Sequence, residues 1–138
     1  MENSKITIRA TINADVEKVW RYYTEPEHIT QWNFASDDWH SPRAENDLRP
    51  GGKYMARMEA KDGSEGFDFE AIYDDVVPRK KIAYTMTDGR QAIVSFDKAD
   101  GSTKITISFD AENTNPDELQ RQGWQAILNN FKTYTESH

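Results

Sequence analysis

The 138 residues include no cysteine. This absence excludes disulfide bonds, thiolate metal sites and cysteine nucleophiles, and it is typical of a reducing compartment, so we predict a cytoplasmic location. Surplus positive charge is also missing, since 17 Lys and Arg stand against 24 Asp and Glu and give a formal net charge of −7. Nucleic-acid binding needs clustered Lys and Arg to neutralise phosphates, so we do not expect a nucleic-acid partner.

Long hydrophobic runs and catalytic signatures are absent as well. No apolar run approaches the roughly 20 residues of a membrane span, and the opening MENSKITIR lacks the apolar core of a signal peptide. The three histidines, His28, His40 and His138, show no metal-ligand spacing, and no nucleophile elbow or phosphate-binding loop occurs. We therefore expect a soluble protein without metal, cofactor or integral membrane association, and we assign no catalytic residue.

Most of the chain alternates between apolar and polar residues, which is the pattern of strands with one buried face. Strands are predicted over residues 5–12, 53–60, 67–73, 82–87, 91–97 and 105–109. A further strand over 39–44 would have to lie at a sheet edge or contain a bulge, because Pro42 cannot donate a ladder hydrogen bond. Arg49-Pro50-Gly51-Gly52 and Asp88-Gly89 are turn signals between these strands.

Two short helices are predicted after the first strand. One follows the capping residues at 13–15 and continues to Tyr23, and the other starts from the capping-box pattern at 24–27 and continues towards Trp32. The segment 116–134 then repeats apolar residues at steps of three and four, with Asn115 as its expected cap. A helix of about 20 residues would be ~30 Å long and could cross a small sheet.

Gly123 lies in the middle of the apolar face of this long helix, beside Trp124. A glycine there costs the helix roughly 1 kcal/mol relative to alanine, so we expect close approach of a strand or of a bound molecule. Strands and helices are segregated along the chain, which predicts an α+β fold with an antiparallel sheet and a single domain over residues 1–138. A curved sheet spanned by the long helix would bury the apolar face of every predicted strand.

Several motifs carry a family resemblance. They are Val19-Trp20, Glu25-Pro26-Glu27 with Trp32, the turn from Arg49 to Tyr54, the segment 77–82, and Gly123 to Tyr134. In this order they resemble the START-like helix-grip (SRPBCC) superfamily of lipid-transfer domains, Bet v allergens and polyketide cyclases. They are most similar to the branch related to the C-terminal domain of the activator of heat-shock protein 90 ATPase. The resemblance implies a six- or seven-stranded antiparallel sheet wrapped around the long helix, and a cavity that often holds an apolar or amphipathic molecule.

Aromatic residues are the strongest functional indication, with four Trp, six Tyr and six Phe. A pocket lined by aromatic rings with a few polar groups is typical of small-molecule sites. We predict non-catalytic binding of a small hydrophobic or aromatic molecule, and the predicted lining residues are Trp32, Trp39, Tyr54, Phe69, Tyr84, Met86 and Trp124. A filled aromatic core would explain the same residues equally well.

Two other functions stay open from the sequence. A cyclase- or dehydratase-type enzyme would need a buried acid–base residue in the cavity, for which Glu70, His40 and Tyr84 are the candidates, although the alternation favours a solvent-facing Glu70. The family also implies a chaperone partner, but the co-chaperone carries a separate N-terminal domain that has no counterpart in this sequence, so we do not expect chaperone stimulation. The oligomeric state, monomer or homodimer, cannot be predicted.

Overall fold

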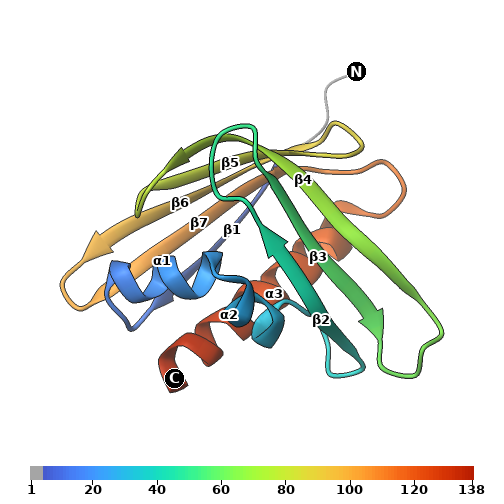
Figure 1. Ribbon diagram of the computed structural model, residues 1–138, viewed down its shortest axis with the longest axis horizontal. Coiled ribbons are helices and arrows are strands. Elements are labelled where there is room, and N and C mark those ends of the chain that lie inside the picture. The colour runs from blue at the N-terminus through green and yellow to red at the C-terminus, as the bar shows by residue number, and fades with distance from the viewer. Residues whose placement is uncertain (1–4) are drawn as a thin grey trace.

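The computed structural model describes residues 5–138 and confirms the predicted α+β architecture (Figure 1). Its elements in chain order are β1 (Lys5–Ile12), α1 (Val16–Thr24), α2 (Pro26–Trp32), β2 (Trp39–Asn46), β3 (Lys53–Ala60), β4 (Gly66–Val77), β5 (Lys81–Met86), β6 (Gln91–Ala99), β7 (Ser102–Asp110) and α3 (Asp117–Ser137). Within these residues, no helix has the length and apolar character needed to cross a bilayer. The predicted domain and the predicted absence of a signal peptide include residues 1–4, which lie outside the described residues.

The seven strands form one antiparallel sheet in the order β1-β7-β6-β5-β4-β3-β2. The sheet curls around α3, while α1 and α2 lie near the C-terminal half of that helix (Figure 1). The strand predicted around Pro42 is the edge strand β2, and its register shifts between His40 and Arg43. Pro42 therefore lies both on an edge strand and at a bulge, the two arrangements that were predicted as alternatives.

The predicted alternation places the apolar residues of the strands on the concave face. Ile6, Ile8 and Ile12 of β1 are buried, as are Ile105 and Phe109 of the neighbouring β7. The convex face is polar in most places and carries cross-strand ion pairs. Glu70 lies on this outer face, where its carboxylate is 2.9 Å from Lys53 Nζ, as the alternation of β4 predicted.

The helix starts agree only partly with the capping signals. Asp15 caps α1 by accepting a hydrogen bond from the backbone N–H of Lys18, as expected. The predicted capping box before α2 is wrong, because the Thr24 hydroxyl donates instead to Trp20 O and Glu25 becomes the N-cap without a side-chain bond. The predicted cap of α3 is also wrong: Pro116 is its N-cap residue, and Asn115 bonds to Glu112.

The two glycine signals have opposite outcomes. A Cβ on Gly52 would lie 2.0 Å from the carbonyl oxygen of Asp47, so the turn at 49–52 requires glycine there. Close approach of a strand at Gly123 is wrong, because a Cβ built on this residue meets no heavy atom of another element within 4 Å, and approach of a bound molecule stays a prediction. The glycine in α3 is therefore not needed for packing against a strand.

The long helix is fastened to one edge of the sheet. Arg121 Nη1 donates to Thr7 O at 2.8 Å, Gln125 Nε2 to Arg9 O at 3.1 Å, and Lys132 Nζ to Thr11 O at 2.6 Å. Alternate carbonyls of an edge strand point away from the sheet and would otherwise be open to pairing with another chain. The side chains of α3 satisfy them, which fixes the helix close to β1.

Packing continues from this edge into the core. The Trp124 ring stacks on Phe109 of β7 at a centroid distance of 3.8 Å, and Leu128 and Phe131 are also buried. The C-terminal half of α3 meets the short helices, where Phe131 makes edge contacts with Tyr23 and Trp32 at centroid distances of 5.2 and 5.0 Å. One side of α3 is thus closely packed from end to end.

Candidate functional site

The helix α3 also borders a cavity of about 430 Å³, to which it contributes Trp124, Ile127 and Leu128. It lies between the helix and the concave surface of β3, β4 and β5, with α1 and α2 contributing at one end. The lining residues are Tyr23, Thr24, Trp32, Asn33, Tyr54, Met58, Phe67, Phe69, Tyr73, Ile82, Tyr84, Arg90, Ile107, Glu112, Asn115, Gln120, Trp124, Ile127 and Leu128. Because α3 is held against β1 at the far edge, the sheet around β3–β5 curves over it without closing the space.

The structure brings together five of the seven predicted lining residues. Trp32, Tyr54, Phe69, Tyr84 and Trp124 all border the cavity. They come from α2, β3, β4, β5 and α3, so elements distant in sequence converge on one space. Contact of these residues with a ligand stays a prediction.

The other two predicted residues, Trp39 and Met86, do not line this cavity, and their contact with a ligand also stays a prediction. Trp39 begins the edge strand β2, and its partly exposed ring lies 6.2 Å from that of Phe67, at the outer end of the sheet. Met86 has the inward parity of Tyr84, but it is buried in the core at the end of β5, and beside it lies a smaller pocket of about 170 Å³. Parity gives the face of a strand and does not tell how far along that face a cavity extends.

Sequence reasoning missed several polar members of the lining. Tyr73 shares the strand and parity of Phe69, a signal that was available. Three further residues come from helix faces and a helix end, where the sequence pattern predicted only core or loop positions: Tyr23, Asn33 and Gln120. Glu112 comes from the segment between β7 and α3, which carries no periodic pattern.

Four aromatic side chains form one wall of the cavity across three neighbouring strands. Tyr54 and Phe69 are 6.0 Å apart between ring centroids, Phe69 and Tyr84 6.3 Å, and Tyr73 and Tyr84 6.5 Å. These three pairs are edge-on, a favoured arrangement of aromatic rings. The edges and faces that do not contact another ring provide an apolar surface for a bound molecule.

The hydroxyls of four tyrosines lie on or beside this wall, and two of them have hydrogen-bond partners in the protein. Tyr73 donates to Asn46 Oδ1 at 2.6 Å, and Tyr54 accepts from Asn33 Nδ2 at 3.2 Å. Burial is the main cause that raises the pKa of Tyr23, Tyr54, Tyr73 and Tyr84 above the ordinary tyrosine value. All four hydroxyls are therefore protonated at neutral pH.

The other end of the cavity is framed by the connection between β7 and α3. The buried Gln120 side chain accepts from Glu112 N–H at 2.9 Å and donates to Asn115 O at 2.8 Å. The Glu112 carboxylate in turn accepts from Asn115 N–H at 3.0 Å. These bonds hold the loop in one conformation, so this end of the cavity has a defined polar border.

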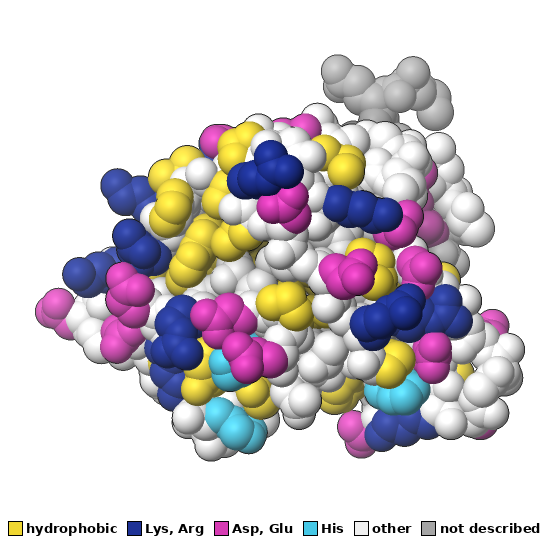
Figure 2. Space-filling model, viewed as in Figure 1, with side chains coloured by type: hydrophobic (Ala, Val, Ile, Leu, Met, Phe, Trp, Pro, Cys, Tyr) yellow, Lys and Arg dark blue, Asp and Glu magenta, His cyan; other side chains and the backbone are white. Residues whose placement is uncertain are grey.

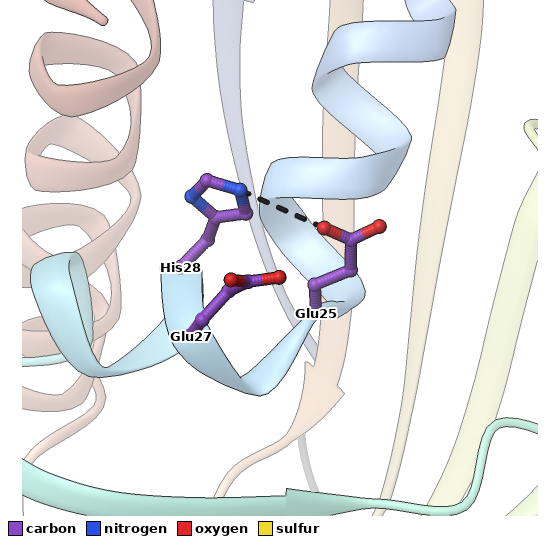
Figure 3. Close-up of side chains that lie close together, drawn as sticks. All are labelled: Glu25, Glu27 and His28. Carbon is purple, nitrogen blue, oxygen red and sulfur yellow. Dashed lines mark ion pairs between the residues drawn. The ribbon is translucent and has the colours of Figure 1, made fainter.

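A second cluster of polar side chains lies outside the cavity, where Glu25, Glu27 and His28 approach one another (Figure 3). His28 Nδ1 lies 2.8 Å from the Tyr134 hydroxyl, Nε2 lies 3.6 Å from Glu25, and the ring stacks on Tyr22 at 4.0 Å. The His28 side chain is only 18% exposed because it joins α2 to α3. Both ring nitrogens have protein partners, so the cluster is explained as a helix–helix contact.

The catalytic candidates from the sequence do not meet in the cavity. Glu70 lies on the convex face, and His40 is 42% exposed on β2 with Glu59 3.6 Å away. Only Tyr84 borders the cavity. The carboxylate that does reach it, Glu112, was not among the candidates.

A curved antiparallel sheet around a long C-terminal helix, with a cavity between them, defines a helix-grip protein of the START-like superfamily. Within that class the chain belongs to the family of activator of Hsp90 ATPase homolog 1-like proteins, whose model matches residues 13–136. This confirms the resemblance read from the motifs. No curated protein matches the chain.

Solved structures agree with this assignment. The chain is 41% identical to an AHSA1-like protein from Aeromonas hydrophila, with a TM-score of 0.92 over 97% of this chain and 93% of that one. It is 52% identical to a protein from Cytophaga hutchinsonii, with a TM-score of 0.84 over 96% of this chain and 92% of that one. A protein from Chromobacterium violaceum, 21% identical with a TM-score of 0.86 over 96% and 98% of the two chains, shares the fold.

Proposed function

We propose that this protein binds one small apolar or aromatic molecule in the cavity between α3 and β3–β5, without chemical conversion. The observation that supports the proposal best is the cavity itself, about 430 Å³ in volume and bordered mainly by aromatic and aliphatic side chains. Protein interiors normally contain few voids larger than a water molecule, whereas ligand pockets of small molecules measure roughly 300–1,000 Å³. A filled core would leave no such space.

The polar groups of the cavity favour binding over catalysis. A general base must be deprotonated at the working pH, and burial keeps the hydroxyls of Tyr23, Tyr54 and Tyr84 protonated. These groups are suited to donate hydrogen bonds and thereby to orient a ligand. The proposal therefore assigns them a recognition role.

A cyclase- or dehydratase-type activity is the second candidate, and one observation favours it. Glu112 provides a carboxylate at the cavity, which is a group that such proton transfers need. Turnover that disappears in Glu112→Gln while binding persists would establish this function. Unchanged ligand after prolonged incubation with the wild-type protein would rule it out for that compound.

The remaining predictions concern partners and location. The surface in Figure 2 mixes side chains of both charges with hydrophobic ones, and the whole chain is acidic. A chaperone partner, a cytoplasmic location and the choice between monomer and homodimer stay predictions. Pull-down with the chaperone and sedimentation velocity address the partner and the oligomeric state.

Binding is tested by a two-dimensional NMR titration with a library of small apolar and aromatic compounds. The indole N–H signals of Trp32 and Trp124 report on two walls of the cavity. Ile127→Trp places an indole ring inside the cavity and narrows it, and Ile72→Trp is its matched control, because Ile72 is 45% exposed on the convex face of β4. We expect binders that shift both indole signals in the wild type and in Ile72→Trp, and no binding to Ile127→Trp. Equal binding to both variants would place the ligand elsewhere.

A further inference from the structure

Two tyrosine hydroxyls in the cavity lack a partner within residues 5–138. Tyr73 is satisfied by Asn46, and Tyr54 accepts from Asn33, but no hydrogen bond joins the hydroxyl of Tyr23 or Tyr84 to another described residue. Tyrosine hydroxyls usually find a partner when they are buried, since an unpaired buried donor is costly. These two hydroxyls are thus the unexplained polar groups of the site.

Both hydroxyls face space and are not sealed within the core. Among the described residues, the fully buried side-chain oxygens without a partner are Ser41 Oγ and Thr135 Oγ1, and neither tyrosine is in that group. Tyr23 and Tyr84 both line the cavity, from α1 and β5 respectively. Their hydroxyls therefore point to a polar atom of whatever fills the cavity.

The protonation state makes these groups donors. Burial raises the pKa of both hydroxyls, and the pKa of Tyr84 is raised further by the nearby hydroxyls of Tyr23, Tyr54 and Tyr73. Tyr23 and Tyr84 border the same cavity, so one bound molecule can meet both hydroxyls. Two neutral O–H donors match an oxygen with two lone pairs.

The charges at the cavity border argue against an anionic ligand. Arg90 is the cationic residue among those that line the cavity, and its Nε donates to Asp88 Oδ2 at 2.7 Å. The pKa of Asp110 is lowered chiefly by its hydrogen bond from Lys5 and also by the charge of Arg90, and Glu112 adds another carboxylate to the border. The single positive charge is therefore compensated by acidic side chains, and the low-polarity cavity offers no counter-ion to a buried carboxylate.

We propose that the cavity selects an uncharged apolar or aromatic molecule with a carbonyl oxygen, which accepts hydrogen bonds from the hydroxyls of Tyr23 and Tyr84. This inference rests on the proposed binding function and specifies its ligand class. The aromatic wall of Tyr54, Phe69 and Tyr84 contacts the body of the molecule, and the two hydroxyls fix the position of its oxygen. Selection against hydrocarbons follows because a ligand without an acceptor leaves both donors unpaired.

The test uses three compounds that share two phenyl rings and differ at the central carbon: benzophenone, diphenylmethane and diphenylacetate. Dissociation constants are measured by NMR titration for the wild type, Tyr23→Phe, Tyr84→Phe and Tyr22→Phe. The Tyr22→Phe control removes a hydroxyl from a ring that stacks on His28 and does not line the cavity. The ¹³C shift of carbonyl-labelled benzophenone reports directly on hydrogen bonding to its oxygen.

We expect Tyr23→Phe and Tyr84→Phe each to weaken benzophenone binding about five- to tenfold, since one neutral hydrogen bond contributes roughly that factor. Diphenylmethane binding should change less than about twofold, diphenylacetate should bind most weakly, and the carbonyl shift should move back towards its free value in both variants. Tyr22→Phe should leave the preference for the ketone intact. Benzophenone binding that is insensitive to Tyr23→Phe and Tyr84→Phe, or tighter binding of diphenylacetate, would overturn the ligand class alone. Absence of binding by all three compounds and by the library would overturn the proposed function as well.

Discussion

The two sides of α3 differ in how they meet the sheet. Towards β1 and β7 the helix is fastened by three side-chain bonds to edge carbonyls, and Trp124 stacks on Phe109 at 3.8 Å. Towards β3–β5 it faces a cavity of about 430 Å³. The same helix therefore both packs against the sheet and borders the cavity, and Trp124 takes part in both contacts.

The difference shows how a small domain can keep a cavity. A void lined by large side chains forfeits dispersion contacts, and those lost contacts must be offset by close packing elsewhere. Here the fully buried side chains, such as Ile6, Ile12, Phe109 and Phe131, gather on the β1–β7 side and around the short helices. Most of the close packing is therefore on this side of the molecule, although the buried Leu128 also borders the cavity.

The strongest way to test this comparison is to truncate one phenylalanine on each side. Phe109→Ala removes a fully buried ring on β7 and should lower the free energy of unfolding by about 3–5 kcal/mol. Phe69→Ala on β4 removes a ring that already borders empty space, so the loss should be about 1 kcal/mol. Urea unfolding of the two variants measures the contrast, and equal losses would show that both sides are packed alike.

A ligand bound in the cavity should stabilise the folded protein. At a ligand concentration of 100 times the dissociation constant, the free energy of unfolding should rise by about 2.7 kcal/mol. The gain should persist in Ile72→Trp and be lost in Ile127→Trp, where an indole ring occupies part of the cavity. Thermal unfolding with and without the ligand measures it, and a gain in Ile127→Trp would contradict the placement of the site.

Alkaline pH should destabilise the protein through the tyrosines on the cavity side. The folded-state pKa of Tyr84 is raised above the ordinary value of 10.0, so its stabilising contribution is complete below that value and is lost as pH rises above it. The loss should approach about 1.4 kcal/mol per pH unit for each such tyrosine. The free energy of unfolding of Tyr84→Phe should fall less steeply with rising pH than that of the wild type. Denaturant titrations across the alkaline range measure this difference. Identical pH profiles would place Tyr84 in a solvated environment.

The smallest expected effect is at Gly123. Because a Cβ there meets no atom within 4 Å, Gly123→Ala should stabilise α3 by about 0.5–1 kcal/mol through helix propensity alone. Chemical denaturation measures the gain. Reduced stability would mean that the backbone at this position is packed more closely than the structure shows.

The sequence predicted the strands well because each has one buried face, and alternation records that face residue by residue. β1 and β7 follow the pattern throughout, and even the bulge at Pro42 was visible. The family motifs then supplied the arrangement of sheet and helix. Helix caps were less predictable, because the expected capping side chains bond elsewhere. Thr24 donates to Trp20 O, and Asn115 donates to Glu112.

The site was only partly visible from the sequence. Alternation identified Tyr54, Phe69 and Tyr84 as inward-facing, but it could not tell a filled core from an open cavity. That distinction depends on where α3 sits across the sheet, and its position is set by bonds from α3 to β1 between residues more than a hundred positions apart. Met86 was misplaced for the same reason, since it faces inward beyond the end of the cavity.

The most direct test of the central claim is native mass spectrometry of the protein mixed with the tightest binder from the library. Wild type and Ile72→Trp should each carry one ligand molecule, which leaves on unfolding, and Ile127→Trp should carry none. Uptake by Ile127→Trp, or more than one molecule on the wild type at low ligand excess, would contradict a single binding site between α3 and β3–β5.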